Sequence, residues 1–407
     1  MERKMNRKER AKQERENRRH NISLLRTIPY PDHQKWWSSE TVALVTGANR
    51  GIGFEIARQL LLQGVTVILT SRGTEVGEAA AKVLWETGLK VVFRQLDVTS
   101  TSSVQTCADW VQQNYGGLDI LINNAGVNFN ASSENSVEFA EQVIATNYIG
   151  TKNMIKALTP LMRPSAAGAR IVNVSSRLGR LNGRRNRIGD VSLREPLECV
   201  DSLTEEVIDR TVDAFLEQVK DGSWATGGWP QTFTDYSISK LAVNAYTRLM
   251  AEKLSDRPEG KKIYINCCCP GWVKTAMTGW EGNISAEEGA DTAVWLAFLP
   301  DQSVSELFGP FVRKINCEME KKSCCSGRSC CPSTRAVRPV ATPKEEPGVT
   351  VKTPKAEDVK PEIITEVEGH HATAAVKVER KEAGNVAAVK KEEAVKVNVG
   401  CGGGACN

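Results

Sequence analysis

The chain has 407 residues, and its charge is distributed unevenly along them. The first 20 residues carry nine Lys or Arg and four Glu, whereas residues 341–400 carry ten basic and eleven acidic residues and no aromatic one. The stretch between them is close to neutral, so we expect no nucleic-acid partner for it, because binding to phosphates requires a basic surface. No apolar run reaches the roughly 18–20 residues of a membrane-spanning helix, and we expect no membrane contact.

Composition divides the chain into three parts. We expect residues 1–35 to be a basic N-terminal arm, residues 36–317 to form the folded domain, and residues 318–407, with their Lys/Glu/Val/Ala/Pro repeats, to be a disordered low-complexity tail. The N-terminus lacks the apolar stretch of a secretory signal, and its four glutamates are atypical of a transit peptide. Several of the twelve cysteines lie among apolar residues, which is typical of reduced thiols, so we expect a cytoplasmic protein.

From residue 41 onward, short β-branched runs alternate with segments of helical periodicity. The β-branched runs lie at 42–46, 66–70, 90–96, 119–123, 169–175 and 262–268, with a last one at 308–315. The helical segments lie at 51–63, 75–87, 100–115, 137–162 and 236–254. This alternation indicates βαβ units, whose strands pair in parallel. We therefore expect an α/β fold, a Rossmann-type doubly wound parallel seven-stranded sheet with helices on both faces.

Residues 177–235 interrupt this alternation, and we expect a mostly helical insertion there. Ser202 and Glu205 have the spacing of a capping box, which marks the start of a helix. The apolar residues that follow fall on one helical stripe: Leu203, Val207, Ile208, Val212, Phe215, Leu216 and Val219.

The first strand runs directly into a glycine-rich turn, TGANRGIG at 46–53, and a helix follows. Glycines here let the backbone turn tightly and approach a pyrophosphate, which the free N–H groups of the helix N-terminus stabilise. Between a strand and a helix this pattern predicts a dinucleotide site, and a plain tight turn is the alternative.

The second strand ends at Arg72 rather than at an acid. An acid at this point would accept a hydrogen bond from the ribose 2′-hydroxyl of NAD, whereas Arg72, helped by Arg50, would pair with the 2′-phosphate of NADP. We therefore predict NADPH/NADP+ as the cofactor; two solvated surface arginines are the alternative.

Tyr236 and Lys240 are four residues apart at the start of a predicted helix, so they share one face. A lysine cation beside a phenol stabilises the phenolate and lowers the phenol pKa from near 10, which favours proton transfer at neutral pH. Ser176 ends the strand before the insertion, at the sheet edge where ligands bind in open parallel sheets. An ordinary helix face has the same spacing by chance.

The positions of the four histidines exclude several classes of enzyme. They are His20, His33, His370 and His371, so none lies in the predicted domain beyond residue 33. A Ser-His-Asp hydrolase or a His-ligated zinc site therefore has no histidine there, and we expect no metal.

Residues 41–316 resemble the short-chain dehydrogenase/reductase superfamily. They are most similar to its monomeric carbonyl-reductase branch, and within it to plant neomenthol-dehydrogenase and salutaridine-reductase-like proteins. The motifs that carry the resemblance occur in the family's order: TGANRGIG at 46–53, Asp97-Val98, NNAG at 123–126, Asn147, VSS at 174–176, YSISK at 236–240, and Pro270-Gly271 with Thr275.

The resemblance implies roles for these residues. The cofactor would be held by Gly47, Asn49, Arg50, Gly51, Ile52, Gly53, Arg72, Asp97, Val98, Asn124, Ala125, Gly126, Tyr236, Lys240, Pro270, Gly271, Val273 and Thr275. Ser176 would hydrogen-bond the substrate carbonyl, and Tyr236 would donate its proton as hydride arrives from the nicotinamide. Lys240 would tune Tyr236, and Asn147 would complete a proton relay.

We therefore expect an oxidoreductase that transfers hydride between NADPH and a small hydrophobic ketone or aldehyde, reversibly to the alcohol. Substrate contacts are expected from Ser176, Tyr236 and Trp229. In the carbonyl-reductase branch an insertion such as 177–235 covers the helix face that others use for tetramer contacts, which implies a monomer. A catalytically silent NADPH-binding protein and an RNA-associated protein acting through residues 1–20 are the alternatives.

Overall fold

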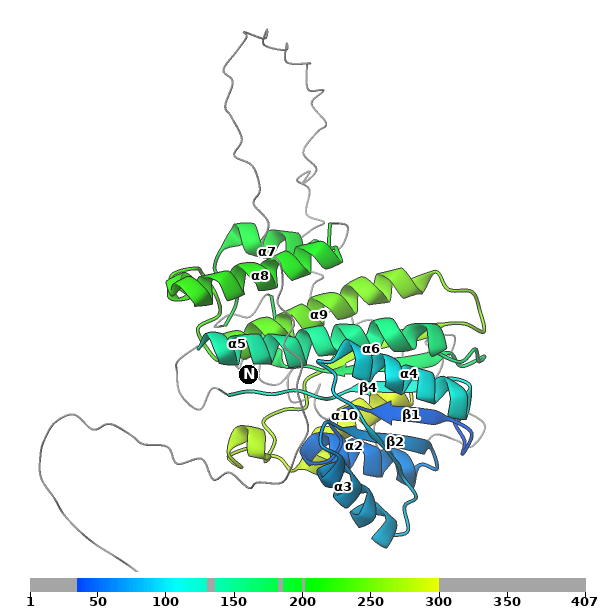
Figure 1. The fold of residues 1–407 in the computed structure, drawn as a ribbon. Coiled ribbons are helices and arrows are strands. Elements are labelled where there is room, and N and C mark those ends of the chain that lie inside the picture. Colours follow the sequence, from blue (N-terminus) through cyan, green and yellow to red (C-terminus); the bar gives the residue numbers. More distant parts are fainter. Residues whose placement is uncertain (1–34, 130–135, 182–185, 200–201, 300–407) are drawn as a thin grey trace, which may run out of the picture. The chain divides into compact units, whose positions relative to one another are not determined.

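A computed structural model describes residues 35–129, 136–181, 186–199 and 202–299 (Figure 1). The predicted strand at 308–315, the tail and nearly all of the basic arm lie outside these residues. None of the described helices is long and apolar enough to cross a membrane.

The described residues contain one six-stranded parallel sheet. Its strands are β1 (Val42–Val45), β2 (Thr66–Ser71), β3 (Val92–Gln95), β4 (Ile120–Asn123), β5 (Ala169–Val174) and β6 (Ile263–Cys268). They lie in the order β3-β2-β1-β4-β5-β6, with β1 paired to both β2 and β4. The chain thus winds outward in two directions from β1, which creates a switch point between β1 and β4 where such folds bind ligands. The predicted doubly wound α/β fold is confirmed, with six strands in the described part in place of the seven expected over the whole domain.

Alternate side chains of each strand face opposite layers of helices. On β1, Val42 and Leu44 join one apolar cluster, and Ala43 and Val45 join the other. All four are buried, so the strand is apolar on both faces and lacks the alternation of a half-exposed strand.

The two helical layers cover both faces of the sheet (Figure 1). One layer consists of α2 (Gly51–Leu62), α3 (Thr74–Glu86) and α10 (Ala286–Ala297). The other consists of α4 (Thr101–Tyr115), α5 (Val137–Ile144), α6 (Gly150–Leu158) and α9 (Thr234–Ser255). Helix α10 is absent from the predicted elements, although a capping box between Ser285 and Glu288 marks its start.

The segment predicted as one helix at 137–162 is divided in the structure. Between α5 and α6 the chain forms one turn of π-helix, Ala145–Ile149, and α6 ends in a 3₁₀ turn at Thr159–Leu161. A π-turn inserts an extra residue into the helix and often marks a functional position.

The insertion is helical, as predicted, and contains α7 (Val191–Glu198) and α8 (Glu205–Asp221). Helix α8 packs against α5 and α9, and the predicted apolar stripe faces the core. The predicted capping box is wrong by two residues. Thr204 is the N-cap, because its Oγ1 accepts the Val207 N–H at 3.3 Å, whereas the Ser202 hydroxyl donates to the Cys199 carbonyl.

Candidate active site

Two adjoining cavities lie where the parallel strands end. The cofactor groove, of about 550 Å³, runs along the glycine-rich turn, and the catalytic pocket, of about 260 Å³, contains the predicted catalytic residues. Both are lined by Ile52, Asn124, Gly126, Asn128, Thr275 and Met277, so they are continuous.

The glycines of the turn keep the cofactor groove open. Gly47 has φ +60°, and a Cβ there would lie 2.9 Å from the Cα of Ala125. A Cβ at Gly53 would lie 2.3 Å from the Asn124 amide nitrogen and 2.6 Å from the Gly47 carbonyl oxygen. Helix α2 begins at Gly51, which lines the groove, so its first N–H groups suit an anion such as a pyrophosphate.

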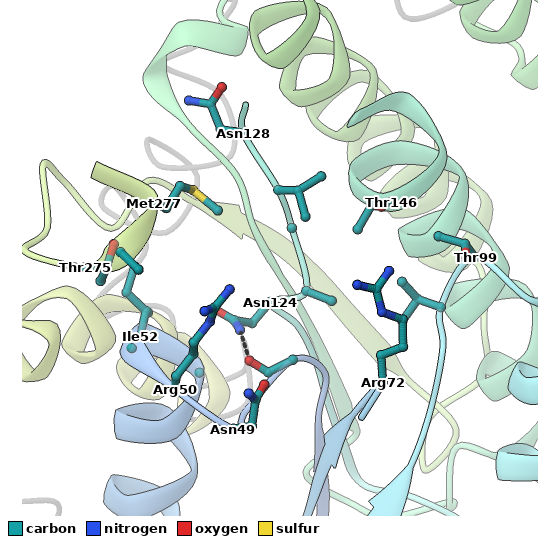
Figure 2. Close-up of a pocket in the computed structure, with 18 of the residues that line it drawn as sticks. Asn49, Arg50, Ile52, Arg72, Thr99, Asn124, Asn128, Thr146, Thr275 and Met277 are labelled. Atoms are coloured by element: carbon teal, nitrogen blue, oxygen red, sulfur yellow. Dashed lines mark hydrogen bonds between the residues drawn. The ribbon is translucent and has the colours of Figure 1, made fainter. Parts of the chain in front are cut away.

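The end of β4 fastens this turn to the sheet. The Asn124 side chain donates to the carbonyl of Thr46 at 2.9 Å and to that of Gly47 at 3.1 Å; Figure 2 shows one hydrogen bond from its amide. Thr46 Oγ1 in turn accepts the N–H groups of Asn124 and Ala125, both at 2.9 Å. Thr46 is therefore a supporting residue that the predicted site omitted, although it begins the motif.

The charge of the cofactor groove is predominantly positive. Arg50 and Arg72 extend into it from different elements, one at the start of α2 and the other after β2 (Figure 2). Asp97 is the only acid among the described lining residues, and its carboxylate accepts the Thr99 N–H and hydroxyl at 2.9 and 2.7 Å. Two arginines with one engaged carboxylate suit a ligand with several phosphates, so these residues fit the predicted cofactor.

Ser176, Tyr236 and Lys240 come together in the catalytic pocket. Ser176 follows β5 and hydrogen-bonds to the Tyr236 side chain. The Lys240 ammonium lies 5.6 Å from the centre of the Tyr236 ring and donates to the Val174 carbonyl at 2.8 Å. The residue before α9, Phe233, has φ +46°, a left-handed conformation that is rare for an aromatic residue and typical of functional sites.

Burial dominates the protonation of this pair. Burial, reinforced by the charge of Cys269, raises the pKa of Tyr236 to about 12, although the hydrogen bond with Ser176 lowers it. Burial also lowers the pKa of Lys240 to about 8, although the nearby Cys268 and Cys269 raise it. The predicted lowering of the phenol pKa is therefore wrong for this arrangement, because removing both groups from water disfavours their charged forms.

Asn147 lies in the π-helix and is fully buried. Its side chain accepts the Val127 N–H at 2.8 Å and donates to the Val127 carbonyl and to Ser239 Oγ, both at 3.0 Å. Gly126 borders both Asn147 and Lys240, since a Cβ there would lie 3.1 Å from Asn147 Oδ1 and 3.6 Å from Lys240 Nζ. The structure thus places the side chains of Asn147 and Lys240 near each other, both next to Gly126.

The remaining predicted residues lie in the two cavities, with one exception. Asn49, Ile52 and Val98 line the cofactor groove, and Pro270, Gly271 and Val273 line the catalytic pocket. Trp229, expected at the substrate, lines neither. It is 2% exposed, packs on Phe215, and donates from Nε1 to Gln218 at 2.8 Å. It belongs to the core of the insertion.

Loop residues that the sequence did not single out complete the catalytic pocket. Met277, Cys269 and Thr232 line it. Loops carry no periodicity, so the sequence gives no signal for which of their side chains face a cavity. The described residues contain no group of three His, Cys, Asp or Glu placed to hold a metal ion.

The short chain dehydrogenase family matches this chain over residues 41–187 and 222–283. The chain belongs to the short-chain dehydrogenase/reductase family. The unmatched gap coincides with α7 and α8, so the insertion is an addition to the common domain.

Individual relatives are similar to this chain over about two thirds of its length. Short-chain dehydrogenase/reductase 1 of Saponaria officinalis is 41% identical over 290 residues, which cover 65% of this chain and 92% of the relative. Carbonyl reductase [NADPH] 3 of Rattus norvegicus is 40% identical over 278 residues, covering 68% and 97%.

Solved structures agree with this assignment. Salutaridine reductase from Papaver somniferum has a TM-score of 0.59 and 37% identity, over 64% of this chain and 96% of its own. Menthone neomenthol reductase from Mentha piperita has a TM-score of 0.54 and 35% identity, over 64% and 94%. The predicted superfamily and its resemblance to plant reductases are confirmed.

Proposed function

We propose that this protein is an NADPH-dependent reductase of ketones or aldehydes, which runs in reverse on secondary or primary alcohols. The observation that carries the proposal is the Ser176–Tyr236 pair beside Lys240, in a pocket continuous with a basic, glycine-lined groove. The carbonyl reductases among its relatives, which carry NADPH in their names, support the same assignment.

The cofactor groove would hold NADPH. Gly47, Gly51 and Gly53 would admit its diphosphate to the start of α2, and Arg50 and Arg72 would pair with the 2′-phosphate. When bound, NADPH supplies a hydride from C4 of its nicotinamide ring.

The chain's own residues would handle the substrate oxygen and its proton. Ser176 and Tyr236 would hold the carbonyl oxygen by hydrogen bonds, and the phenol would then transfer its proton to that oxygen. A phenol with a raised pKa is protonated at neutral pH, as a general acid must be. The Lys240 cation, with Asn147 beside it, would stabilise the phenolate that remains.

The walls of the catalytic pocket favour an apolar substrate. Phe233, Trp272 and Met277 line it, and Trp272 and Met277 remain 43% exposed, as is typical of a surface that awaits a ligand. A small hydrophobic carbonyl compound would bury this surface on binding.

We propose that the protein is monomeric. Helix α8 packs against α5 and α9 and so covers the outer side of that layer, where the fold would otherwise offer a flat helical surface to another copy. Light scattering during gel filtration should give the mass of one chain, and a tetramer would contradict the proposal.

We also propose a cytoplasmic location. Among the described cysteines, Cys107, Cys267 and Cys269 are free thiols. Reduced cysteines in this number suit a reducing compartment. Imaging of the tagged full chain tests this, and accumulation in a secretory compartment would contradict it.

Tyr236→Phe separates an enzyme from a silent NADPH-binding protein. We expect the variant to bind NADPH normally and to lose roughly 10²–10⁴-fold in the rate of NADPH oxidation over a panel of monoterpenoid, quinone and alkaloid carbonyls. Tyr115→Phe, on α4 and outside both cavities, is the matched control. Full activity in Tyr236→Phe, or none in the unmodified protein, would refute the proposal.

A further inference from the structure

A polar cluster behind the active site connects the insertion to the π-helix. Tyr148 Oη donates to Asp209 Oδ1 of α8 at 2.6 Å, and Lys152 Nζ contacts both Asp209 oxygens at 2.8 Å. Glu205, one turn earlier on α8, lies 3.4 Å from Lys152 and also pairs with Lys156. We call Tyr148, Lys152, Glu205 and Asp209 the α8 clamp.

Tyr148 is the most deeply buried member of the clamp and contacts both neighbouring helices. It is 1% exposed, and its ring lies edge-on to Tyr246 of α9 with the ring centres 6.2 Å apart. Burial, with the hydrogen bond and charge of Asp209, raises the pKa of the Tyr148 phenol, so it remains a donor at every working pH. A donor and a carboxylate acceptor at 2.6 Å form a strong, partly buried hydrogen bond.

The clamp holds a residue of the π-turn that carries Asn147. A π-turn is less favourable than regular α-helix and persists where its surroundings hold it. Tyr148 directly follows Asn147, whose amide donates to Ser239 Oγ, and that hydroxyl donates to the Tyr236 carbonyl. Asn147 therefore has contacts to α9 on one side, while its neighbour is fixed to α8 on the other.

We propose that Tyr148 and Asp209 are positioning residues, through which the insertion holds the π-turn so that Asn147 stays beside Lys240. This inference rests on the proposed function for its effect on rate. The insertion then contributes to catalysis from behind the site as well as covering the helical layer. Loss of the clamp lets the segment relax toward regular helix, which rotates Asn147 away from Lys240 and weakens support for the phenolate.

The test compares two clamp variants with a packing variant of the same helix. Tyr148→Phe removes only the hydroxyl, and Asp209→Asn removes the charge that Lys152 and the hydroxyl share. Val219→Ala shortens a buried side chain of α8 that makes no polar contact in the described structure, so it lowers stability without touching the clamp.

We expect both clamp variants to lose about tenfold in kcat with little change in KM for the carbonyl or in NADPH affinity. The pH profile of kcat should shift in the clamp variants and stay in place in Val219→Ala. Asp209→Glu, which keeps the carboxylate, should recover part of the rate. Equal kcat and equal pH profiles in clamp and packing variants would overturn the inference.

Amide hydrogen exchange tests the same inference without turnover. Residues 144–151 should exchange faster in Tyr148→Phe and Asp209→Asn than in Val219→Ala at equal global stability, and equal exchange would overturn it. An inactive unmodified protein would refute the proposed function while the exchange result still decides whether the clamp holds the π-turn.

Discussion

The cofactor groove and the catalytic pocket, which are the two halves of the active site, are formed by different kinds of group. The cofactor groove is shaped by backbone: glycines at 47 and 53 leave space that any Cβ would fill, and its arginines extend into an open cleft. The catalytic pocket depends on buried polar side chains: Lys240, which lines it, is 5% exposed, and Asn147, which lies near Lys240 but outside the lining, is 0% exposed. The glycine-rich part of the groove therefore forms from a short local motif, whereas proton chemistry requires groups gathered from distant parts of the chain.

Burial determines the protonation of the two titratable groups in the catalytic pocket. The pKa values of Tyr236 and Lys240 move in opposite directions, to about 12 and about 8, because burial favours the neutral form of each. The pocket thus pairs a weak acid, Tyr236, with a lysine, Lys240, that loses its proton readily. Burying the charged form of this lysine lowers the stability of the fold. Each prediction below changes one half and leaves the other intact.

The largest effect on cofactor binding is expected in the groove, from Gly53→Ala. Its Cβ would lie 2.3 Å from the Asn124 amide and 2.6 Å from the Gly47 carbonyl, so the turn must open. We expect NADPH affinity, measured by fluorescence titration, to fall more than about 100-fold.

Gly64→Ala is the control for this prediction. Gly64 has φ +82°, and a Cβ there would have no neighbouring atom within 4 Å, so alanine strains the backbone without meeting another group. We expect about 1 kcal/mol of lost stability and unchanged NADPH affinity. Equal affinities in the two variants would show that the glycine cradle is not the cofactor site.

Arg72→Gln should change cofactor choice by a smaller factor. Removing this cation deletes a charge-assisted contact to the 2′-phosphate, and we expect kcat/KM for NADPH to fall roughly 10–50-fold while that for NADH is unchanged. Lys82→Gln, on the exposed side of α3, controls for the loss of a surface charge. A parallel fall for both cofactors would remove Arg72 from phosphate recognition.

The pH dependence should follow Lys240 in the pocket. Its pKa of about 8 means that the free enzyme loses this cation as pH rises through 8. We expect kcat/KM for NADPH, which reports ionisations of the free enzyme, to be level below pH 8 and to fall about tenfold per pH unit above it. A level profile up to pH 10 would contradict this assignment.

Lys240→Met should make the protein inactive and more stable. Because the pKa in the fold lies below the ordinary value of 10.5, the buried cation destabilises the fold fully below pH 8 and progressively less up to pH 10.5. The penalty is about 3 kcal/mol, from which the lost hydrogen bond to Val174 subtracts about 1. Urea unfolding at pH 7 and pH 10.5 should show a gain at the first pH only; no gain at pH 7 would contradict it.

Much of this molecule is readable from its sequence because local signals agree with the fold. The glycine-rich turn lies between β1 and α2, as its motif predicts. The six described strands lie at the first six β-branched runs of the sequence. Tyr236 and Lys240 share a helix face because α9 begins at Thr234, just before them.

Features that depend on tertiary contacts were not predictable in this way. The periodicity of apolar residues is the same for a regular α-helix and for a helix that contains a π-turn. In this protein the π-turn contains Tyr148, which donates a hydrogen bond to Asp209 of the insertion. Trp229 is a residue type that is common in ligand pockets, yet its indole N–H donates a hydrogen bond to Gln218 inside the insertion. Whether the pKa of Tyr236 is raised or lowered depends on burial, which the spacing of residues in the sequence does not reveal.

The most direct test of hydride transfer uses NADPH carrying two deuterium atoms at C4 of the nicotinamide ring, with a carbonyl substrate found in the panel. The account predicts an alcohol with one deuterium on the former carbonyl carbon, formed by the unmodified protein and by Tyr115→Phe and at least about 100-fold more slowly by Tyr236→Phe. An alcohol without deuterium, or equal product from Tyr236→Phe, would contradict it.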